Sequence, residues 1–423
     1  MGESDVTGPS QPSAAAEWRA SWTLVLAATV GYSISSIPAG STGVMMGPIE
    51  AEFGWSRTEI YSGVALISFI GVLLATFIGA GIDRFGARPI GIAAGAAMSA
   101  AIAALALVGE SLWQWWALWA LVGLASAAMP TVWLTPVAGR FTASRGLAVA
   151  IVLSGSGLAT FAVPIISHAL VEAYGWRGAY MGLGMIWAVL TLPLLLLFFH
   201  GGGNPSSGKR TGAAATAPAE LPGFTVSQGF RSVNFYKLLL AAFFGIFGGV
   251  ALIMNLVPVL ISTGIPRGSA ATVSGLIGIA TITGRIAGGW LLDRMSAKLI
   301  AALSTSLAAV LPVILLLFPG SAALAAIAII IYGLVGGAKI GATAYLASRH
   351  LGQRAFGTLY GTINASIAFA VGTAPLAANF IYDLTGSYEI VMWAAAPILL
   401  LGGAIYASLG TYPDFAPKER SAG

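Results

Sequence analysis

Long apolar stretches separated by short polar segments recur along the whole 423-residue chain. A helix needs about 20 apolar residues to cross the hydrocarbon core of a bilayer. Backbone polar groups in lipid must be satisfied internally, so each stretch of about that length is predicted to be a helix. The twelve predicted helices lie at about residues 21–46, 59–82, 89–109, 113–138, 146–171, 177–199, 237–263, 269–292, 299–318, 321–347, 355–382 and 388–410. The pattern predicts an all-α membrane protein with twelve transmembrane helices.

The longest polar interruption divides the predicted helices into six and six. It is rich in Gly, Pro, Ser and Ala, which is typical of a linker. The predicted divisions are a disordered cytoplasmic tail (1–18), an N-terminal six-helix bundle (19–200), a cytoplasmic linker (201–235), a C-terminal six-helix bundle (236–411) and a second cytoplasmic tail (412–423).

The two halves carry an internal repeat. The segment GAGIDRFGAR recurs as GWLLDRMSAK about 210 residues later. The residues Gly79, Asp83, Arg84 and Arg88 correspond to Gly289, Asp293, Arg294 and Lys298. A second set at offsets of about 210 residues matches Arg145, Pro164 and Gly175 with Arg354, Pro375 and Gly386. Two independent matches at one spacing predict a duplicated six-helix unit with pseudo-symmetric halves.

The distribution of basic residues predicts the orientation. When the helices are threaded alternately with the N-terminus inside, the inner segments carry most of the 20 Lys and Arg. The outer loops carry Arg57, Arg177 and Arg267, and two further basic residues lie within helices. Cytoplasmic loops are enriched in Lys and Arg. We therefore expect a multi-pass protein of the inner (plasma) membrane with both termini in the cytoplasm.

Composition supports the membrane assignment and excludes several kinds of chemistry. Hydrophobic residues make up 57% of the chain, charged residues 8%, and the mean hydropathy is +0.87. The net charge of +5 fits basic inner loops, so no nucleic-acid partner is expected. With no cysteine and three histidines, no metal site or cofactor is expected. No catalytic constellation or phosphate-binding loop is found, so we predict neither an enzyme nor an ATP-driven pump.

Two basic residues, Arg285 and Lys339, lie inside apolar stretches that contain no acidic residue. A charge near the bilayer centre costs about 3 kcal/mol on insertion scales, so such residues usually face a cavity within the protein. At 1.5 Å per helical residue, Arg285 lies about 12 Å from Asp293 and Lys339 about 15 Å from Arg349, so the two have similar depth. The pair predicts a binding site for an anion that crosses the membrane.

A polar stripe accompanies each charge. Thr281 lies one helical turn before Arg285, while Tyr332 and Thr343 share a helix face with Lys339. The planar guanidinium of arginine suits a permanent carboxylate anchor, and lysine changes its protonation more readily when buried. We therefore predict Arg285 as the anchor and Lys339 as a second anion contact or a protonation-linked group.

The motif GAGIDRFGAR resembles the signature loop of the major facilitator superfamily. Within that superfamily, PIEAEFGWSR, RGLAVAIVLSGSGLATFAVP, YGWRGAY and RAFGTLYG are similar to segments of the monocarboxylate and oxalate/formate transporter group. The resemblance implies a fold of two six-helix halves that moves small carboxylates, with a proton or in exchange. It also implies a substrate-binding arginine in the eighth helix, which Arg285 matches. Many bacterial relatives have an acidic residue in the tenth helix, where this chain has Lys339.

The repeated motif also predicts a gate. Glycine would let two helices approach closely, and the charged residues would form a network at the cytoplasmic mouth that holds one conformation. The predicted gating residues are Gly79, Asp83, Arg84, Arg88, Asp293 and Arg294.

Other polar residues inside helices are further candidates for the cavity. Those predicted to contact substrate besides the two cations and Tyr332 are Asn255, Asn364, Tyr32 and Trp133. For the serines of the first, fifth and eleventh helices, hydrogen bonding to their own helix is the simpler interpretation. We predict packing at the outer interface, not proton relay, for His168.

These observations predict a secondary active transporter of a small organic anion, a monocarboxylate or related carboxylate, that works by alternating access. The coupled species is predicted to be a proton in symport or a counter-anion in exchange. The expected state is a monomer in contact with membrane lipid. The alternatives are a multidrug-type exporter of amphipathic compounds, which the absence of intramembrane acids disfavours, and a transporter-like carboxylate sensor.

Overall fold

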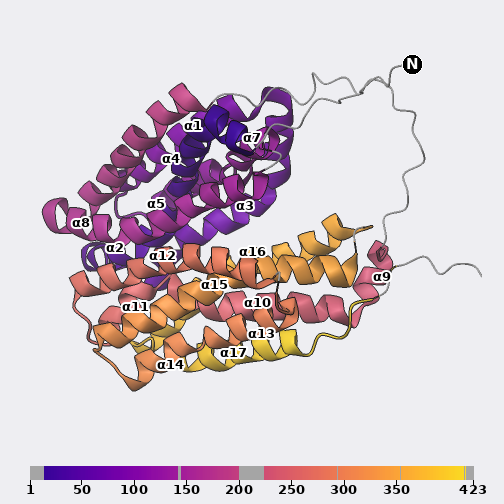
Figure 1. Cartoon of the computed structure of the whole chain (residues 1–423). Coiled ribbons are helices and arrows are strands. Elements are labelled where there is room, and N and C mark those ends of the chain that lie inside the picture. Colours follow the sequence, from indigo (N-terminus) through magenta and orange to yellow (C-terminus); the bar gives the residue numbers. More distant parts are fainter. Residues whose placement is uncertain are drawn as a thin grey trace, which may run out of the picture.

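The computed structural model describes residues 14–141, 144–199, 223–292, 294–352, 354–413 and 415. These residues form two helical bundles that lie against each other (Figure 1), and within the described part the chain has no β-strand longer than a single bridge, Gly223 to Gly352. The N-terminal bundle comprises residues 14–199 and the C-terminal bundle residues 223–413. The all-α prediction is confirmed.

The N-terminal bundle is built from eight α-helices and two short 3₁₀ helices. They are α1 (Ala14–Ser33), η1 (Ile34–Ser36), α2 (Ile37–Phe53), α3 (Arg57–Phe85), α4 (Ala87–Ala104), η2 (Leu105–Leu107), α5 (Leu112–Ser126), α6 (Met129–Val132), α7 (Leu134–Arg140) and α8 (Arg145–Phe198).

The C-terminal bundle is built from nine α-helices. They are α9 (Val226–Arg231), α10 (Val233–Ile253), α11 (Leu256–Ser262), α12 (Arg267–Leu292), α13 (Ala297–Leu307), α14 (Val310–Leu317), α15 (Ala322–Leu351), α16 (Phe356–Thr385) and α17 (Glu389–Ala407).

The helices account for twelve membrane crossings. Nine helical stretches of the described chain are long and apolar enough to cross a membrane by themselves. The remaining crossings are α3, the broken helix α5 to α7, and the second limb of α8, which changes direction at Gly175. The predicted twelve-helix fold is confirmed.

Glycines in the left-handed backbone region mark equivalent helix ends in the two bundles. Gly54 (φ 66°) ends α2 and Gly264 (φ 94°) follows α11, 210 residues later. Gly175 (φ 70°) and Gly386 (φ 72°) hold the same positions 211 residues apart. Glycine adopts these angles without the clash that a Cβ would cause. The pairs show that the duplication predicted from sequence extends to the local backbone.

Helix ends differ from the predicted windows where polar side chains supply hydrogen bonds. α1 begins at Ala14, inside the predicted tail, and the Glu17 carboxylate accepts hydrogen bonds from the N–H and hydroxyl of Ser144, each 3.1 Å long. α9 lies inside the predicted linker segment. Thr225 and Gln228 form a capping box at its start. The division of the chain at 201–235 remains a prediction, since most of that segment lies outside the described residues.

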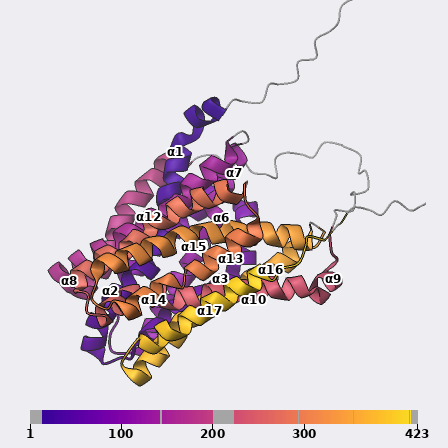
Figure 2. The same cartoon turned by 60° about the horizontal axis from the view of Figure 1, so that its bottom comes forward.

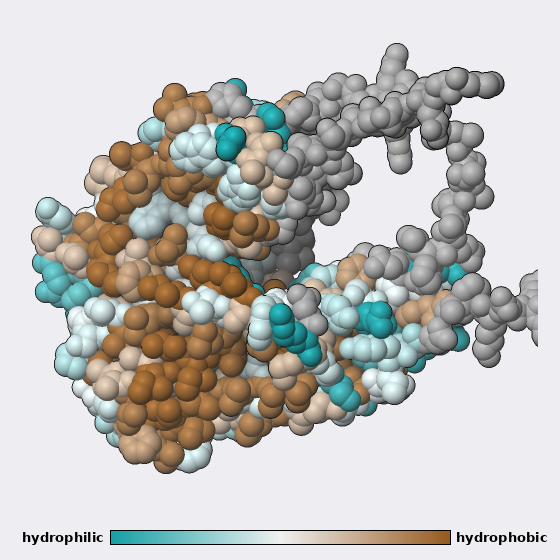
Figure 3. Space-filling model, in the orientation of Figure 1, coloured by the Kyte–Doolittle hydropathy of each residue, from teal (hydrophilic) through white to brown (hydrophobic). Residues whose placement is uncertain are grey.

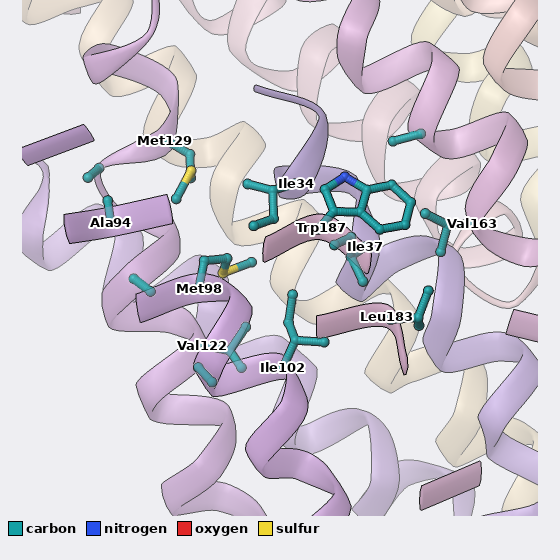
Figure 4. Close-up of a cluster of buried hydrophobic side chains, with 14 of the residues drawn as sticks. Ile34, Ile37, Ala94, Met98, Ile102, Val122, Met129, Val163, Leu183 and Trp187 are labelled. Atoms are coloured by element: carbon teal, nitrogen blue, oxygen red, sulfur yellow. The ribbon is translucent and has the colours of Figure 1, made fainter. Parts of the chain in front are cut away.

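The core of the N-terminal bundle is aromatic and aliphatic. Figure 4 shows side chains of η1, α4, α5 and α8, among them Ile34, Met98, Val122 and Trp187, meeting in one cluster. The indole N–H groups of Trp115 and Trp187 find acceptors, at the Ile60 carbonyl and at Ser33 Oγ, each 2.9 Å away. On the outside, large apolar side chains form a broad hydrophobic surface over both bundles (Figure 3). Lipid would cover such a surface in a membrane.

The bundles have two distinct ends. We call the end that holds α9 and Gly352 the linker end, and the opposite end, where α2 and α11 finish, the far end (Figure 1). At the far end the Asp383 carboxylate of α16 accepts hydrogen bonds from the backbone N–H groups of Arg57 (3.0 Å) and Thr58 (2.9 Å), at the start of α3. Arg57 also donates to the Tyr388 hydroxyl at 3.2 Å and lies 3.6 Å above the Tyr382 ring. These contacts join the two bundles.

Candidate functional site

A cavity of about 420 Å³ lies between the two bundles at the depth of Arg285 and Lys339. Its wall is formed by η1, α2 and α8 of the N-terminal bundle and by α10, α11, α12 and α15 of the C-terminal bundle. Arg285 and Lys339 both line it, and the wall contains no acidic residue within the described chain. The two basic residues that the sequence singled out therefore line one cavity.

Arg285 reaches from α12 across the boundary between the bundles. Its Nη1 donates a hydrogen bond to the Leu153 carbonyl of α8 at 2.9 Å, with Ser156 Oγ 3.5 Å away. The Tyr32 hydroxyl of α1 lies close enough to interact electrostatically with the guanidinium. An arginine has five N–H donors. In the contacts of the described chain only Nη1 is bound, so the guanidinium keeps donors for a ligand.

Lys339 is buried, with 7% of its surface exposed, and lies at the edge of the same cavity. Its Nζ donates to the Gly245 carbonyl of α10 at 2.9 Å. Thr305 of α13 lies beside the same glycine. The ammonium thus points toward the interior of the C-terminal bundle, and one of its three N–H donors is bound to the backbone.

Neither cation is neutralised by a carboxylate in the described part of the chain. The ion pairs found there join Arg57 to Glu50 at 3.2 Å and Arg177 to Glu52. Both lie at the far end, where α2 finishes. Two uncompensated cations beside a cavity attract an anion, because an isolated buried charge is energetically costly.

Glycines bring the two cation-bearing helices into backbone contact. α12 and α15 lie side by side (Figure 2). A Cβ on Gly284 would overlap the Leu334 carbonyl, and one on Gly337 would overlap the Thr281 carbonyl and the Arg285 N–H. Small residues permit this close approach in membrane helices. The contact fixes the separation of Arg285 and Lys339 along the cavity wall.

The structure places the predicted polar stripe only in part. Tyr332 and Thr281 line the cavity with the two cations. Thr343 does not: it is buried, and its hydroxyl bonds the Lys339 carbonyl and lies 2.9 Å from the Tyr406 hydroxyl. Helical spacing puts Tyr332, Lys339 and Thr343 on one side of α15, but Thr343 bonds within the bundle and is not part of the cavity wall.

Three other predicted contact residues, Trp133, Asn255 and Asn364, are not among the residues that line the cavity. Trp133 is fully buried in the N-terminal core, where its indole packs on Phe199 and its N–H points at Met129 Sδ. Asn255 is fully buried at the junction of α10 and α11 and donates to the Ala251 carbonyl at 3.0 Å. Asn364 is exposed. The structure therefore places Trp133 and Asn255 in packed surroundings, and the role of all three residues stays a prediction.

Several wall residues were not singled out from the sequence. Ser35 and Ala39 of the first crossing, and Thr160 and Pro164 of α8, line the cavity. Ser156, Thr160 and Pro164 recur at i, i+4 and i+8 and so share one helix face, a signal that was present in the sequence. As predicted, most helix serines bond to their own helix, as Ser156 does to the Leu153 carbonyl at 2.8 Å.

The predicted gating residues that the structure describes lie on helices α3, α4 and α12 or next to them, at the linker end. Arg88 donates to the Leu196 carbonyl at 3.1 Å, and Arg84 lies 5.2 Å from the Phe85 ring centroid. Arg294 donates to the Trp290 carbonyl at 3.3 Å and lies 4.0 Å above that ring. Asp293, the surroundings of Gly79 and the side chain of Asp83 lie outside the described part of the structure. The charge network at this end therefore stays a prediction.

The sequence pattern of the Major Facilitator Superfamily matches residues 28–374, which is most of the chain. The chain belongs to the Major Facilitator Superfamily. It is a multi-pass membrane transporter, not an enzyme, as the sequence motifs predicted.

Curated relatives are monocarboxylate transporters at low identity. The chain is 25% identical over 320 residues to monocarboxylate transporter 12-B of Danio rerio, covering 68% of this chain and 65% of that protein. It is 27% identical over 179 residues to monocarboxylate transporter 12 of Rattus norvegicus, 37% of each chain. The match to monocarboxylate transporter 13 of Bos taurus, 26% over 412 residues, covers 94% of this chain and 92% of that protein. The first two matches thus span less than two thirds of those relatives.

Solved structures confirm the fold. Two crystal structures of a bacterial homologue of the human lysosomal transporter Spinster superpose with TM-scores of 0.69 and 0.71. They cover 91% and 94% of this chain, and 95% and 97% of those chains. Sequence identity is 18% and 16%, so the likeness concerns the arrangement of helices.

Proposed function

We propose that the protein transports a small organic carboxylate, with Arg285 as the group that binds the carboxylate. The observation that carries the proposal is an arginine on the wall of an inter-bundle cavity, with no acidic residue on that wall within the described chain. A guanidinium matches the geometry of a carboxylate and can bind it through two parallel hydrogen bonds. The names of the curated relatives support this substrate class.

Lys339 would supply the second contact. Its ammonium is bound to the Gly245 carbonyl in this conformation, so substrate binding would compete with a backbone carbonyl for the lysine. A buried lysine without an acidic partner can also release its proton, which would couple carboxylate transport to proton movement. A counter-anion taking the substrate's place at Arg285 would give exchange. The two modes differ in whether an imposed pH gradient drives accumulation.

Transport would proceed by alternating access between the two ends. The contacts of Asp383 with the start of α3 hold the bundles together at the far end. The bonds from Arg285 to α8 cross between the bundles at mid-depth, so an anion that competes for the guanidinium would loosen them. We place the linker end in the cytoplasm of a plasma (inner) membrane protein, because basic residues gather in the segments at that end.

The alternative of a multidrug-type exporter of amphipathic cations is disfavoured by the cavity wall. Cationic drugs need carboxylates or aromatic faces to replace their hydration. The described wall has Tyr332 as its one aromatic residue and two cations that would repel such a ligand. A carboxylate sensor would bind the same ligand without moving it.

The test is counterflow of radiolabelled mono- and dicarboxylates in proteoliposomes that hold the purified protein, with a pH gradient imposed or absent. We expect accumulation of a carboxylate in wild type and loss of it in Arg285→Gln. A charge-assisted hydrogen bond contributes about 1.5–3 kcal/mol, so kcat/KM should fall by about 10- to 150-fold. Arg285→Lys should retain part of the activity, because it keeps the charge and loses the planar fork.

Arg19→Gln is the matched control, since Arg19 is exposed near the start of α1. It should transport like wild type. Equal transport by Arg285→Gln and wild type at matched expression would exclude Arg285 as the anchor. Binding of a carboxylate without accumulation would favour the sensor.

A further inference from the structure

A second, uncharged pocket adjoins the cavity of Arg285 and Lys339. It has a volume of about 200 Å³ and shares Ser35, Ala39 and Met254 with that cavity. Its remaining wall comes from α2, α3 and α5 on one side and from α16 on the other. The two spaces are therefore neighbours, and both cations lie on the wall of the larger one.

The wall of the second pocket is mostly apolar. It contains no charged residue, and Val64, Ile67, Val371 and Pro375 supply aliphatic surface. Tyr61 presents its ring, since its hydroxyl donates to the Met254 carbonyl. A polar group that already has a hydrogen-bond partner in the protein is not left unsatisfied when an apolar ligand covers it.

Two of the three serines on this wall are likewise engaged, while the third, Ser68, has no hydrogen bond within the described chain. Ser35 Oγ donates to the Tyr32 carbonyl at 2.7 Å, and Ser126 Oγ donates to the Gly123 carbonyl at 2.9 Å. Such bonds to the preceding helical turn leave the methylene side of a serine available for packing. A ligand group in this pocket would gain affinity chiefly by leaving water.

The size of the pocket matches one ring. An apolar protein cavity of about 150 Å³ holds a benzene molecule, so about 200 Å³ is sufficient for a six-membered ring with a short linker. Ligand sites typically combine such apolar walls with a few polar groups that fix orientation. Here the groups that would fix orientation are Arg285 and Lys339.

We propose that the substrate is an amphipathic carboxylate with an apolar body about the size of one aromatic ring, which the second pocket binds while Arg285 holds the carboxylate. This rests on the proposed carboxylate transport and specifies its substrate class. The pocket makes the body of the acid a determinant of affinity, in contrast to a site for two- or three-carbon acids.

The test measures binding of acids of increasing size to the purified full-length protein in lipid nanodiscs by titration calorimetry. The probes are acetate, butyrate, phenylacetate and 3-phenylpropionate, with 2-phenylacetamide as the uncharged match. Burial of one methylene changes affinity about fourfold, and burial of a Phe-sized group about 10- to 150-fold. We expect phenylacetate to bind about 10- to 150-fold more tightly than acetate, and the amide to bind far more weakly than phenylacetate.

Val371→Phe tests the place of the ring. Val371 lies on α16 at the pocket wall, and a larger side chain there would fill the pocket. The ratio of phenylacetate to acetate affinity should fall to about threefold or less. The matched control is Val189→Phe, at a side chain of α8 that is 71% exposed on the outer surface, and it should keep the wild-type ratio. Val371→Ala, which carries little folding risk, should raise the relative affinity of 3-phenylpropionate.

The outcomes distinguish the ring-pocket proposal from the proposal that the protein binds and transports carboxylates. Acetate and phenylacetate binding with equal affinity would overturn the ring pocket and leave carboxylate binding intact. An affinity ratio in Val371→Phe equal to that of Val189→Phe would also overturn it, since the ring would then lie elsewhere. Binding of the amide as tightly as phenylacetate, or of no acid at all, would overturn both.

Discussion

Replacing Asp383 with alanine removes a carboxylate that joins the two bundles at the far end. Its two oxygens accept hydrogen bonds from the Arg57 and Thr58 N–H groups, 3.0 and 2.9 Å away, at the first turn of α3. These donors have no partner within their own helix, so Asp383 acts as a helix cap supplied by the other bundle. Because the cap exists only while the far end is closed, its loss should destabilise the closed conformation selectively.

The size of the effect follows from the geometry. Loss of a capping side chain costs about 0.5–2 kcal/mol, and Asp383 is exposed, which favours a value near 1 kcal/mol. An equilibrium between far-end-closed and far-end-open conformations would then shift about fivefold toward the open one. Arg57 keeps its contacts with Tyr382 and Tyr388 of the other bundle, so closure should be weakened and not abolished.

The assay uses a single cysteine at Val257, because the native chain contains no cysteine. Val257 is 5% exposed and lies between the central cavity and a small far-end pocket, lining both. In intact cells, a membrane-impermeant maleimide should alkylate Val257→Cys about fivefold faster when Asp383→Ala is also present. Glu389→Ala is the control, an exposed acid at the same end without such a contact to α3 in the described chain. Equal rates in the two double variants would refute the capping contact as a closing force.

Three further substitutions probe the cavity helices. Lys339→Met should raise the apparent melting temperature by about 2–4 °C while reducing transport, because it removes a buried charge without an acidic partner in the described chain; a lower melting temperature would contradict this. Gly337→Ala should lower the apparent melting temperature, because the added Cβ would overlap the Thr281 carbonyl and the Arg285 N–H. The expected drop is about 2–4 °C for each kcal/mol of overpacking, measured by fluorescence-monitored unfolding. The control is Gly336→Ala, because a Cβ at Gly336 would meet nothing within 4 Å; this variant should be neutral or slightly stabilising. Equal effects of the two substitutions on the melting temperature would refute backbone contact between α12 and α15.

The sequence by itself determined the helices, their number and the place of two cations within apolar helices. Insertion of a segment into lipid depends on the composition of about 20 consecutive residues, which is local information. The duplicated left-handed glycines were also accessible, as the match of Gly175 with Gly386 indicates. Arg285 and Lys339 were identified because a charge in an apolar stretch is costly unless it faces a cavity.

Only the tertiary structure decided which side of each helix faces the cavity. A membrane helix that is apolar on all sides gives little sign of its buried face, because lipid is as apolar as the protein core. Trp133 and Asn255 therefore looked like cavity residues and are instead part of the packed core. The bond from Arg285 to the Leu153 carbonyl and the cap that Asp383 places on α3 join residues more than 100 positions apart. Such partners depend on how the two bundles meet, which no single helix specifies.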